Sequence, residues 1–198
     1  LNIMKKLFLL LVIVSVFGVS FAQDNQIPLI GSEAPSFKTN STHGKVVFPG
    51  DFGKSWKILF SHPADFTPVC SSELLELAYL QPKFDKLGVK IAVISTDDVE
   101  MHNMWEAHLE GIDYKNRGKQ TIDFPIFADT EGKASKLYGM LHEPVSTTKD
   151  IRGVFVLDDK NIVRSVNFYP MEVGRNMDEI VRVVEALQTA DQASVLTP

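Results

Sequence analysis

Apolar runs alternate with amphipathic segments along most of the chain. The runs at 57–61 and 89–95 predict buried strands, and a shorter run at 125–127 predicts a third. Apolar side chains at helical spacing predict a helix that begins after Thr67 and ends before Gly88. A second helix is expected over 99–109. The first half of the chain thus predicts strands separated by helices.

The second half continues this alternation and then changes character. One or two helical turns are expected at 133–140. Two strands, at 151–157 and 162–168, are joined by the polar turn 158–161, which is typical of a hairpin. An amphipathic helix follows at 176–190. The order predicts an α/β fold in one domain, with a mixed central sheet and helices on both faces.

The first 22 residues carry another pattern. Two lysines precede an apolar run at 7–19, and Ser20 and Ala22 place small side chains before a cleavage point. Such a run is short for a membrane span and typical of a secretory signal peptide. We therefore expect a signal at 1–22 and a mature domain at 23–198, exported to the periplasm or the exterior without stable membrane association. An uncleaved anchor is the alternative.

Composition narrows the possible partners. The chain has 44% hydrophobic residues and a net charge of −5, and cleavage would make it more acidic by removing two lysines. An acidic chain without a basic cluster argues against nucleic acid or anionic membrane as a partner. It has a single cysteine, Cys70. In an exported protein an unpaired cysteine indicates an intermolecular link, an accident or a reactive thiol.

Cys70 lies where a reactive thiol is expected. The predicted strand at 57–61 is followed by the turn-forming segment 62–68, in which Thr67 suits a helix cap and Pro68 the first helical position. Cys70 then occupies the third position, near unpaired N–H groups and the positive end of the helix dipole, which favours the nucleophilic thiolate. A buried structural cysteine is the plainer alternative.

This segment resembles the peroxiredoxins. In that family a proline, three residues, Thr or Ser and two residues precede the peroxide-attacking cysteine, as in Pro63-Ala64-Asp65-Phe66-Thr67-Pro68-Val69-Cys70. Arg152 begins the strand in which the family places its catalytic arginine. The chain resembles the one-cysteine, peroxiredoxin-6-like subgroup over residues 29–198, most closely in Leu59-Phe60-Ser61-His62-Pro63 and Gly174-Arg175-Asn176-Met177-Asp178-Glu179.

The resemblance implies a thioredoxin-like fold and a thiol peroxidase acting on hydrogen peroxide and small alkyl hydroperoxides. Cys70 would attack a peroxide oxygen and become a sulfenic acid. Arg152 would stabilise the thiolate and the leaving oxygen, Thr67 would orient the substrate, and Pro63 would shield the pocket from water. Without the resemblance, Arg152 is typical of a surface arginine, Thr67 of a helix cap and Pro63 of a turn.

Three further residues match positions around the family's site. His62 could carry protons to the leaving hydroxide, or only satisfy a local hydrogen bond. Glu73 and Arg175 resemble an ion-pair shell that supports the catalytic arginine. We expect no metal and no bound cofactor, because the remaining histidines show no metal-ligand spacing. With no second cysteine, an external thiol must reduce the sulfenic acid, and the family favours a homodimer.

Two features depart from the subgroup. Some members carry a Gly-x-Ser-x-Gly phospholipase element, but here Lys57 replaces its final glycine and no histidine lies just upstream. We therefore expect Ser55 to lie in a turn before a strand. Subgroup members continue beyond the Thr-Pro found here at 197–198, so we expect their C-terminal extension to be short or missing, either by truncation or in a genuinely short protein. A function of another class also remains open, a redox sensor or redox-dependent binding protein in which Cys70 is oxidised without turnover. A thiol–disulfide oxidoreductase lacks its Cys-x-x-Cys pair.

Overall fold

The computed structural model describes residues 27–197, so the predicted signal peptide lies outside the described residues. No helix among these residues has the length and apolar character needed to cross a membrane. The strands are β1 (Phe37–Ser41), β2 (Gly44–Phe48), β3 (Trp56–Ser61), β4 (Val89–Ser95), β5 (Ile126–Ala128), β6 (Arg152–Leu157) and β7 (Val163–Tyr169). The helices are η1 (Gly50–Phe52), α2 (Pro68–Lys86), α3 (Val99–Glu110), η2 (Tyr114–Asn116), α4 (Lys133–Leu137) and α5 (Met177–Ala193).

The strands form one mixed sheet in the order β2-β1-β5-β4-β3-β6-β7. β3 pairs in parallel with β4 and antiparallel with β6, so Phe60 of β3 lies between Val93 and Val154. β4 also pairs in parallel with β5, and the remaining pairs are antiparallel. β3 therefore lies inside the sheet, and it delivers the chain directly to the turn before Cys70.

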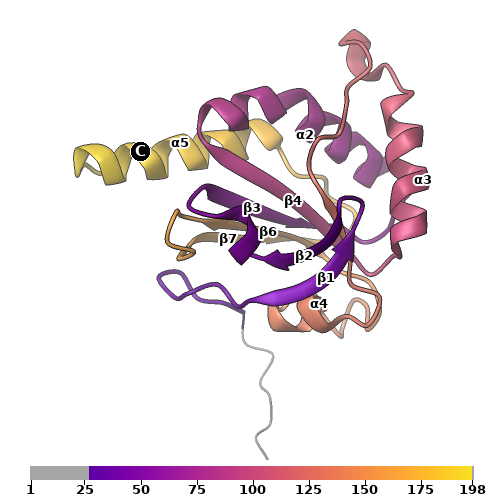
Figure 1. Cartoon of the computed structure of the whole chain (residues 1–198), viewed down its shortest axis with the longest axis horizontal. Helices are drawn as coiled ribbons and strands as arrows, with labels where there is room; N and C mark the ends of the chain where they lie inside the picture. Colours follow the sequence, from indigo (N-terminus) through magenta and orange to yellow (C-terminus); the bar gives the residue numbers. More distant parts are fainter. Residues whose placement is uncertain (1–26, 198) are drawn as a thin grey trace, which may run out of the picture.

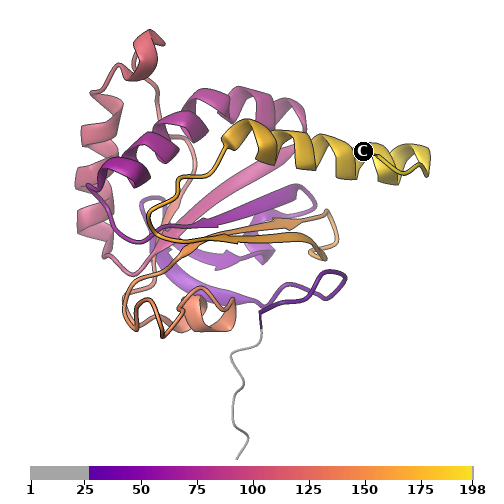
Figure 2. The same ribbon diagram turned by 180° about the vertical axis from the view of Figure 1, so that it is seen from behind.

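Helices cover both faces of the sheet, as the sequence predicts. α2 and α5 lie side by side over one face in both views (Figures 1 and 2). Side chains such as Ile58, Ile91 and Trp105 form the core on that side, where α3 packs as well. The alternate residues of the same strands, such as Leu59 and Ile94, pack with α4 on the opposite face. This two-residue alternation is the ordinary consequence of a pleated strand between two helical layers.

The predicted elements of the second half are present with small changes at their ends. The turns expected at 133–140 form a helix only to Leu137, and Gly139 follows with a φ of +64°, a conformation that ends a helix and that glycine adopts without strain. The hairpin of β1 and β2 is absent from the prediction. Polar residues on β1 give only a weak strand signal, and its pairing with distant β5 stabilises it. Ser55 lies in the turn before β3, as expected.

Candidate active site

Cys70 lies in the first turn of α2, at its third residue, immediately after the turn that leaves β3. Thr67 is the N-cap residue and Pro68 the first residue of the helix. The N–H groups of a first turn have no partner within the helix, so they direct positive partial charge toward this end. Cys70 is a free cysteine and is fully buried, with 0% of its surface exposed. Burial of the thiol leaves the structural alternative open until its neighbours are considered.

An arginine from another strand contacts the sulfur. Nη1 of Arg152, the first residue of β6, lies 3.3 Å from Sγ of Cys70. The same Nη1 donates to Oε2 of Glu73 at 2.6 Å, and Nε donates to the carbonyl of Met171 at 2.8 Å. Only 2% of Arg152 is exposed, which excludes the surface arginine suggested by sequence alone. Its guanidinium is held on two sides and directed at the thiol.

Glu73 joins two arginines at the same place. Arg175 donates from Nε to Oε1 at 2.9 Å and from Nη2 to Oε2 at 2.8 Å, and its backbone N–H donates to Oε1 at 2.6 Å. Nη1 of Arg175 donates to the carbonyls of Ser61 and Gly153, at 2.9 and 2.7 Å. Arg175 therefore ties α2 to β3 and β6, while Glu73 orients Arg152 toward Cys70.

The charge on Glu73 follows from these contacts. Burial alone raises the pKa of its carboxyl, but the hydrogen bonds and charge of Arg175, together with the charge of Arg152, outweigh burial and hold that pKa below its usual value. Glu73 is therefore an ionised carboxylate between two cations. The paired cluster, defined as Glu73, Arg152 and Arg175, carries one net positive charge beside the sulfur, a distribution that favours a thiolate over a thiol.

Thr67 and Pro63 lie on the turn that leads to Cys70. Pro63 is buried, whereas Thr67 is half-buried. Thr67 occupies the N-cap position, but its side chain makes no capping bond, and its hydroxyl donates to the carbonyl of Ala64 at 3.0 Å. The expected capping role of the Thr67 hydroxyl is therefore wrong. Phe66, just before it, adopts a φ of +56°, which is unusual for a bulky side chain and bends the turn sharply.

His62 is completely buried beside this turn, and its ring belongs to a group that sequence reasoning missed. Nε2 of His62 lies 2.8 Å from Oδ1 of Asp65, and Oδ2 of Asp65 lies 2.7 Å from Nδ1 of His102 on α3. A periodicity signal for His102 was available, because it is three residues before the buried Trp105 and seven before the buried Leu109, on the inner face of α3. Asp65 offered no such signal.

Among the described residues, the side chains that could hold a metal ion are His62, Asp65 and Asp97, whose donor atoms lie within 4.8 Å of one another. Both oxygens of Asp65 already face histidines. Oδ2 of Asp97 accepts from the backbone N–H of Asp65 at 2.8 Å, and Oδ1 pairs with Lys149 at 2.6 Å. These groups are hydrogen-bonded to one another, which favours a polar network over ligation.

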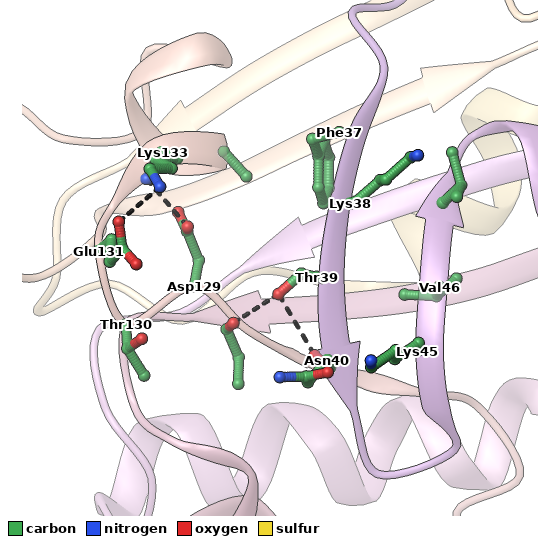
Figure 3. Close-up of a pocket in the computed structure, with 13 residues that line it drawn as sticks. Phe37, Lys38, Thr39, Asn40, Lys45, Val46, Asp129, Thr130, Glu131 and Lys133 are labelled. Atoms are coloured by element: carbon green, nitrogen blue, oxygen red, sulfur yellow. Dashed lines mark hydrogen bonds and ion pairs between the residues drawn. The ribbon is translucent and has the colours of Figure 1, made fainter.

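A surface hollow of about 410 Å³ lies elsewhere, between the β1–β2 hairpin and the start of α4 (Figure 3). Its walls include Phe37, Lys45 and Asp129, but none of the residues around Cys70. Lys133 pairs there with Glu131 at 2.5 Å. The chemistry of the thiol is therefore separate from this hollow.

Known proteins resemble the chain in sequence and in fold. The profile of the AhpC/TSA family matches residues 30–166. A peroxiredoxin of Aquifex aeolicus (strain VF5) is 43% identical over 172 residues, which cover 87% of this chain and 75% of the relative. Among solved structures, a yeast mitochondrial 1-Cys peroxiredoxin has a TM-score of 0.77 and 41% identity. The match covers 87% of this chain and 82% of that protein's chain. That structure is described with thiol resolution via glutathione/thioredoxin systems. The structure of a mutant peroxiredoxin 6 of Arenicola marina has a TM-score of 0.80 and 34% identity. The match covers 86% of this chain and 78% of that protein's chain.

Proposed function

Because the chain belongs to the AhpC/TSA family and is a thiol-dependent peroxidase of the peroxiredoxin type with a thioredoxin-like fold, we propose that Cys70 is its peroxide-attacking residue. The observation that carries this assignment is the 3.3 Å contact between Nη1 of Arg152 and Sγ of Cys70. A cysteine with a purely structural role needs no buried guanidinium beside it. Because burying a guanidinium is costly unless it has a partner, its place next to the sulfur favours a reactive thiolate. The substrates are hydrogen peroxide and small alkyl hydroperoxides, because the sulfur of Cys70 is fully buried and favours small molecules.

Each step of the reaction has a residue on the described chain. The thiolate of Cys70 attacks one peroxide oxygen, the O–O bond breaks, and the sulfur becomes a sulfenic acid. Arg152 stabilises first the thiolate and then the negative charge on the departing oxygen, because Glu73 and Met171 hold its guanidinium in place. Since Cys70 is fully buried, the peroxide reaches the sulfur by displacing side chains of the turn before α2.

The turn residues supply orientation and proton transfer. The Thr67 hydroxyl, which does not cap the helix, is available to bind peroxide oxygens after a rotation away from Ala64. Pro63 contributes an apolar wall without a competing N–H donor. His62, adjacent to Pro63, carries a proton between the thiol and the leaving oxygen.

The second half of the cycle depends on a reductant from outside the chain. Cys70 is the single cysteine of the sequence, so the sulfenic acid is reduced by a small thiol or by the thiol of another protein. The yeast relative is described with glutathione and thioredoxin systems, which supports the same two classes of reductant here. The cycle requires no bound cofactor or metal.

Location and assembly complete the proposal. The basic, apolar and small-residue segments at 1–22 support export and cleavage, and hence a periplasmic or extracellular enzyme. β7 lies at one edge of the sheet, and an unpaired edge can pair with a second copy of itself. We therefore infer a homodimer that uses this edge.

Peroxide turnover tests the proposal. With excess dithiothreitol or glutathione, the chain should consume many equivalents of hydrogen peroxide per protein, and Cys70→Ser should consume none, because the serine hydroxyl is not ionised at neutral pH. The measurement is peroxide loss over time. Oxidation that stops after one equivalent in the presence of excess thiol would instead support the redox sensor, and equal consumption by Cys70→Ser would overturn the role of Cys70.

A further inference from the structure

A second group of buried titratable side chains lies next to the paired cluster. It consists of His62, Asp65 and His102, and we call it the histidine–aspartate relay. The carboxylate of Asp65 bridges the two rings, with 2.8 Å to Nε2 of His62 and 2.7 Å to Nδ1 of His102. Both histidine side chains are 0% exposed and that of Asp65 is 1% exposed. The relay joins the turn before α2 to helix α3.

The hydrogen bonds determine where the protons lie on His102. Nε2 of His102 lies 3.1 Å from the carbonyl of Phe127, which only accepts, so Nε2 carries a hydrogen. Burial alone raises the pKa of Asp65, but the hydrogen bonds from His102 and His62 outweigh it and leave that pKa below its usual value. An ionised Asp65 also only accepts, so Nδ1 of His102 carries a hydrogen too. His102 is thus an imidazolium paired with a carboxylate.

The same reasoning leaves one nitrogen of His62 open. Burial lowers the pKa of His62 and outweighs its hydrogen bond to Asp65, so the ring is neutral near pH 7. Its Nε2 donates to Asp65, which leaves Nδ1 with a lone pair. Nδ1 is buried and has no hydrogen-bond partner among the described residues. A buried acceptor without a partner is costly, so a partner that arrives during the reaction is expected.

The relay is connected to the Cys70 helix through Trp105. The ring of His62 packs against that of Trp105, with centroids 5.0 Å apart, and Nε1 of Trp105 donates to Oγ of Ser71 at 3.2 Å. Ser71 directly follows Cys70. Glu106 on α3 also faces the relay, because its carboxyl interacts with the charge of His102. Two more charged groups are Asp97, which accepts from the Asp65 N–H, and Lys149, which pairs with Asp97. These two charges offset each other.

We propose that Asp65 and His102 are positioning residues of the peroxidase reaction, which hold His62 in the tautomer whose Nδ1 is free to take and return a proton. This inference rests on the proposed function. The Asp65 carboxylate stabilises the positive charge that His62 acquires for part of the cycle. His102 keeps that carboxylate ionised and correctly oriented.

The reaction balances without a further reagent. The thiol proton of Cys70 passes through the incoming peroxide to Nδ1 of His62, which has no partner among the described residues before the peroxide arrives. The sulfur bonds to one peroxide oxygen, which ends with one hydrogen, as the O–O bond breaks. The departing oxygen then receives the proton from Nδ1. Sulfur loses two electrons and becomes a sulfenic acid, and the peroxide gains them and leaves as water or an alcohol.

Asp65→Asn tests the proposal with little change in shape. The amide oxygen can accept from Nε2 of His62, and the amide nitrogen can donate to Nδ1 of His102 once His102 has lost the proton on that nitrogen. The hydrogen bonds then persist while the charge is lost. We expect the rate constant of Cys70 oxidation, followed by stopped flow, to fall about 10-fold to 100-fold at pH 7. The part of the pH profile governed by His62 should move to lower pH, because the pKa of His62 falls further without the carboxylate.

Matched variants separate positioning from structure. In a His62→Gln background, Asp65→Asn should cause no additional loss, because Asp65 acts through His62. His108 is an exposed histidine on α3, the helix that carries His102. The variant His108→Gln should keep the normal rate and pH profile. If Asp65→Asn retains the normal rate and profile, the relay is wrong while peroxide turnover stands. If the unmodified chain itself fails to turn over peroxide, the proposed function fails first.

A measurement on the unmodified chain does not depend on the folding of any variant. Nitrogen-15 NMR of the imidazole rings should show His102 with both nitrogens protonated and His62 with a hydrogen on Nε2 alone at pH 7. A neutral His102, or a His62 protonated on Nδ1, would overturn the proposed arrangement.

Discussion

Two buried polar clusters on opposite faces of the sheet differ in whether a side-chain cation is bonded to their carboxyls. The paired cluster beside Cys70 places Glu73 between Arg152 and Arg175. On the α4 side, Asp129 and Asp150 meet at Ser135, whose Oγ lies 2.8 Å from Oδ2 of Asp129 and 3.1 Å from Oδ2 of Asp150. We call this second group the acidic cluster. Among the contacts described, no arginine guanidinium or lysine ammonium is bonded to either carboxyl, although the backbone N–H of Lys133 donates to Oδ1 of Asp129 at 2.9 Å.

The two clusters show opposite consequences of burying a carboxyl. In the paired cluster the arginines hold the pKa of Glu73 low. In the acidic cluster burial raises the pKa of Asp150 to about 7, and the nearby charge of Asp129 adds to the increase. The hydroxyl of Ser135 has one hydrogen, so it can donate to Asp129 while a protonated Asp150 donates to it. Burial therefore raises the pKa of a carboxyl unless bonded cations outweigh it, as the arginines do at Glu73.

The comparison also separates reactivity from packing. The paired cluster leaves a net positive charge beside a nucleophile, which is useful for a reaction that develops negative charge. In the acidic cluster Asp150 keeps its proton below about pH 7. Asp129 of the same cluster also lines the hollow near β1 (Figure 3). The active site is thus the region where a buried carboxylate is paired with two arginines beside a thiol.

Removal of the carboxylate from the paired cluster should have the largest effect. Glu73→Gln leaves two buried guanidiniums without a counter-ion, and we expect the free energy of unfolding to fall by about 3–5 kcal/mol. Urea unfolding measures it. Glu76→Gln is the control, because Glu76 lies on the same helix and pairs with Lys115 and Arg117 near the surface. Its loss should be at most about 1 kcal/mol, and an equal loss for both variants would contradict the comparison.

Arg152→Ala should act mainly on the reaction, because Glu73 keeps Arg175 as its partner. We expect the rate constant of Cys70 oxidation by hydrogen peroxide to fall about 10²-fold to 10³-fold, the usual cost of losing a donor to developing charge. Arg164→Ala removes a guanidinium from neighbouring β7, where it pairs with Asp191, and should leave the rate unchanged. Equal rates for Arg152→Ala and the unmodified chain would show that the arginine is structural.

The acidic cluster should produce a smaller effect that depends on pH. The pKa of Asp150 is about 7 in the folded chain and about 4 in the unfolded chain, so folding retains the proton between these values. The contribution of Asp150 to the free energy of unfolding is therefore fully present below about pH 4. It decreases as the pH rises and is lost as the pH passes about 7. Between pH 5 and 8 we expect a loss of about 2–3 kcal/mol in the unmodified chain, which Asp150→Asn should remove.

Urea unfolding at several pH values measures this decrease. Asp123→Asn removes the same formal charge from an exposed position and should leave the decrease unchanged. A decrease of the same size in Asp150→Asn would assign the pH dependence to another group.

Local signals were enough to locate the nucleophile. The strand before the turn, Thr67 at the cap and Pro68 at the first helical position predicted the helix start within one residue, and hence the place of Cys70. These signals arise from neighbouring residues, so the sequence contains them directly. The same reasoning failed for the Thr67 hydroxyl, which bonds to Ala64, because a backbone position does not determine where a side chain turns.

Partners from distant segments could not be derived in this way. Arg152 was inferred from resemblance alone, and the roles of the site residues remain predictions. Asp65 and His102 are 37 residues apart, and neither position by itself indicates the other. The β1–β2 hairpin was missed for a related reason, since its pairing with β5 joins segments far apart along the chain.

By itself, the sequence determined the alternation of strands and helices, the single thiol at a helix N-terminus and the need for an external reductant. The tertiary structure alone decided which charges surround that thiol. Sheet order places Arg152 of β6 within reach of both the sulfur and the Glu73 carboxylate, and α3 brings His102 to Asp65. The physical reason is that ionisation depends on burial and on counter-ions, and both are properties of the packed chain.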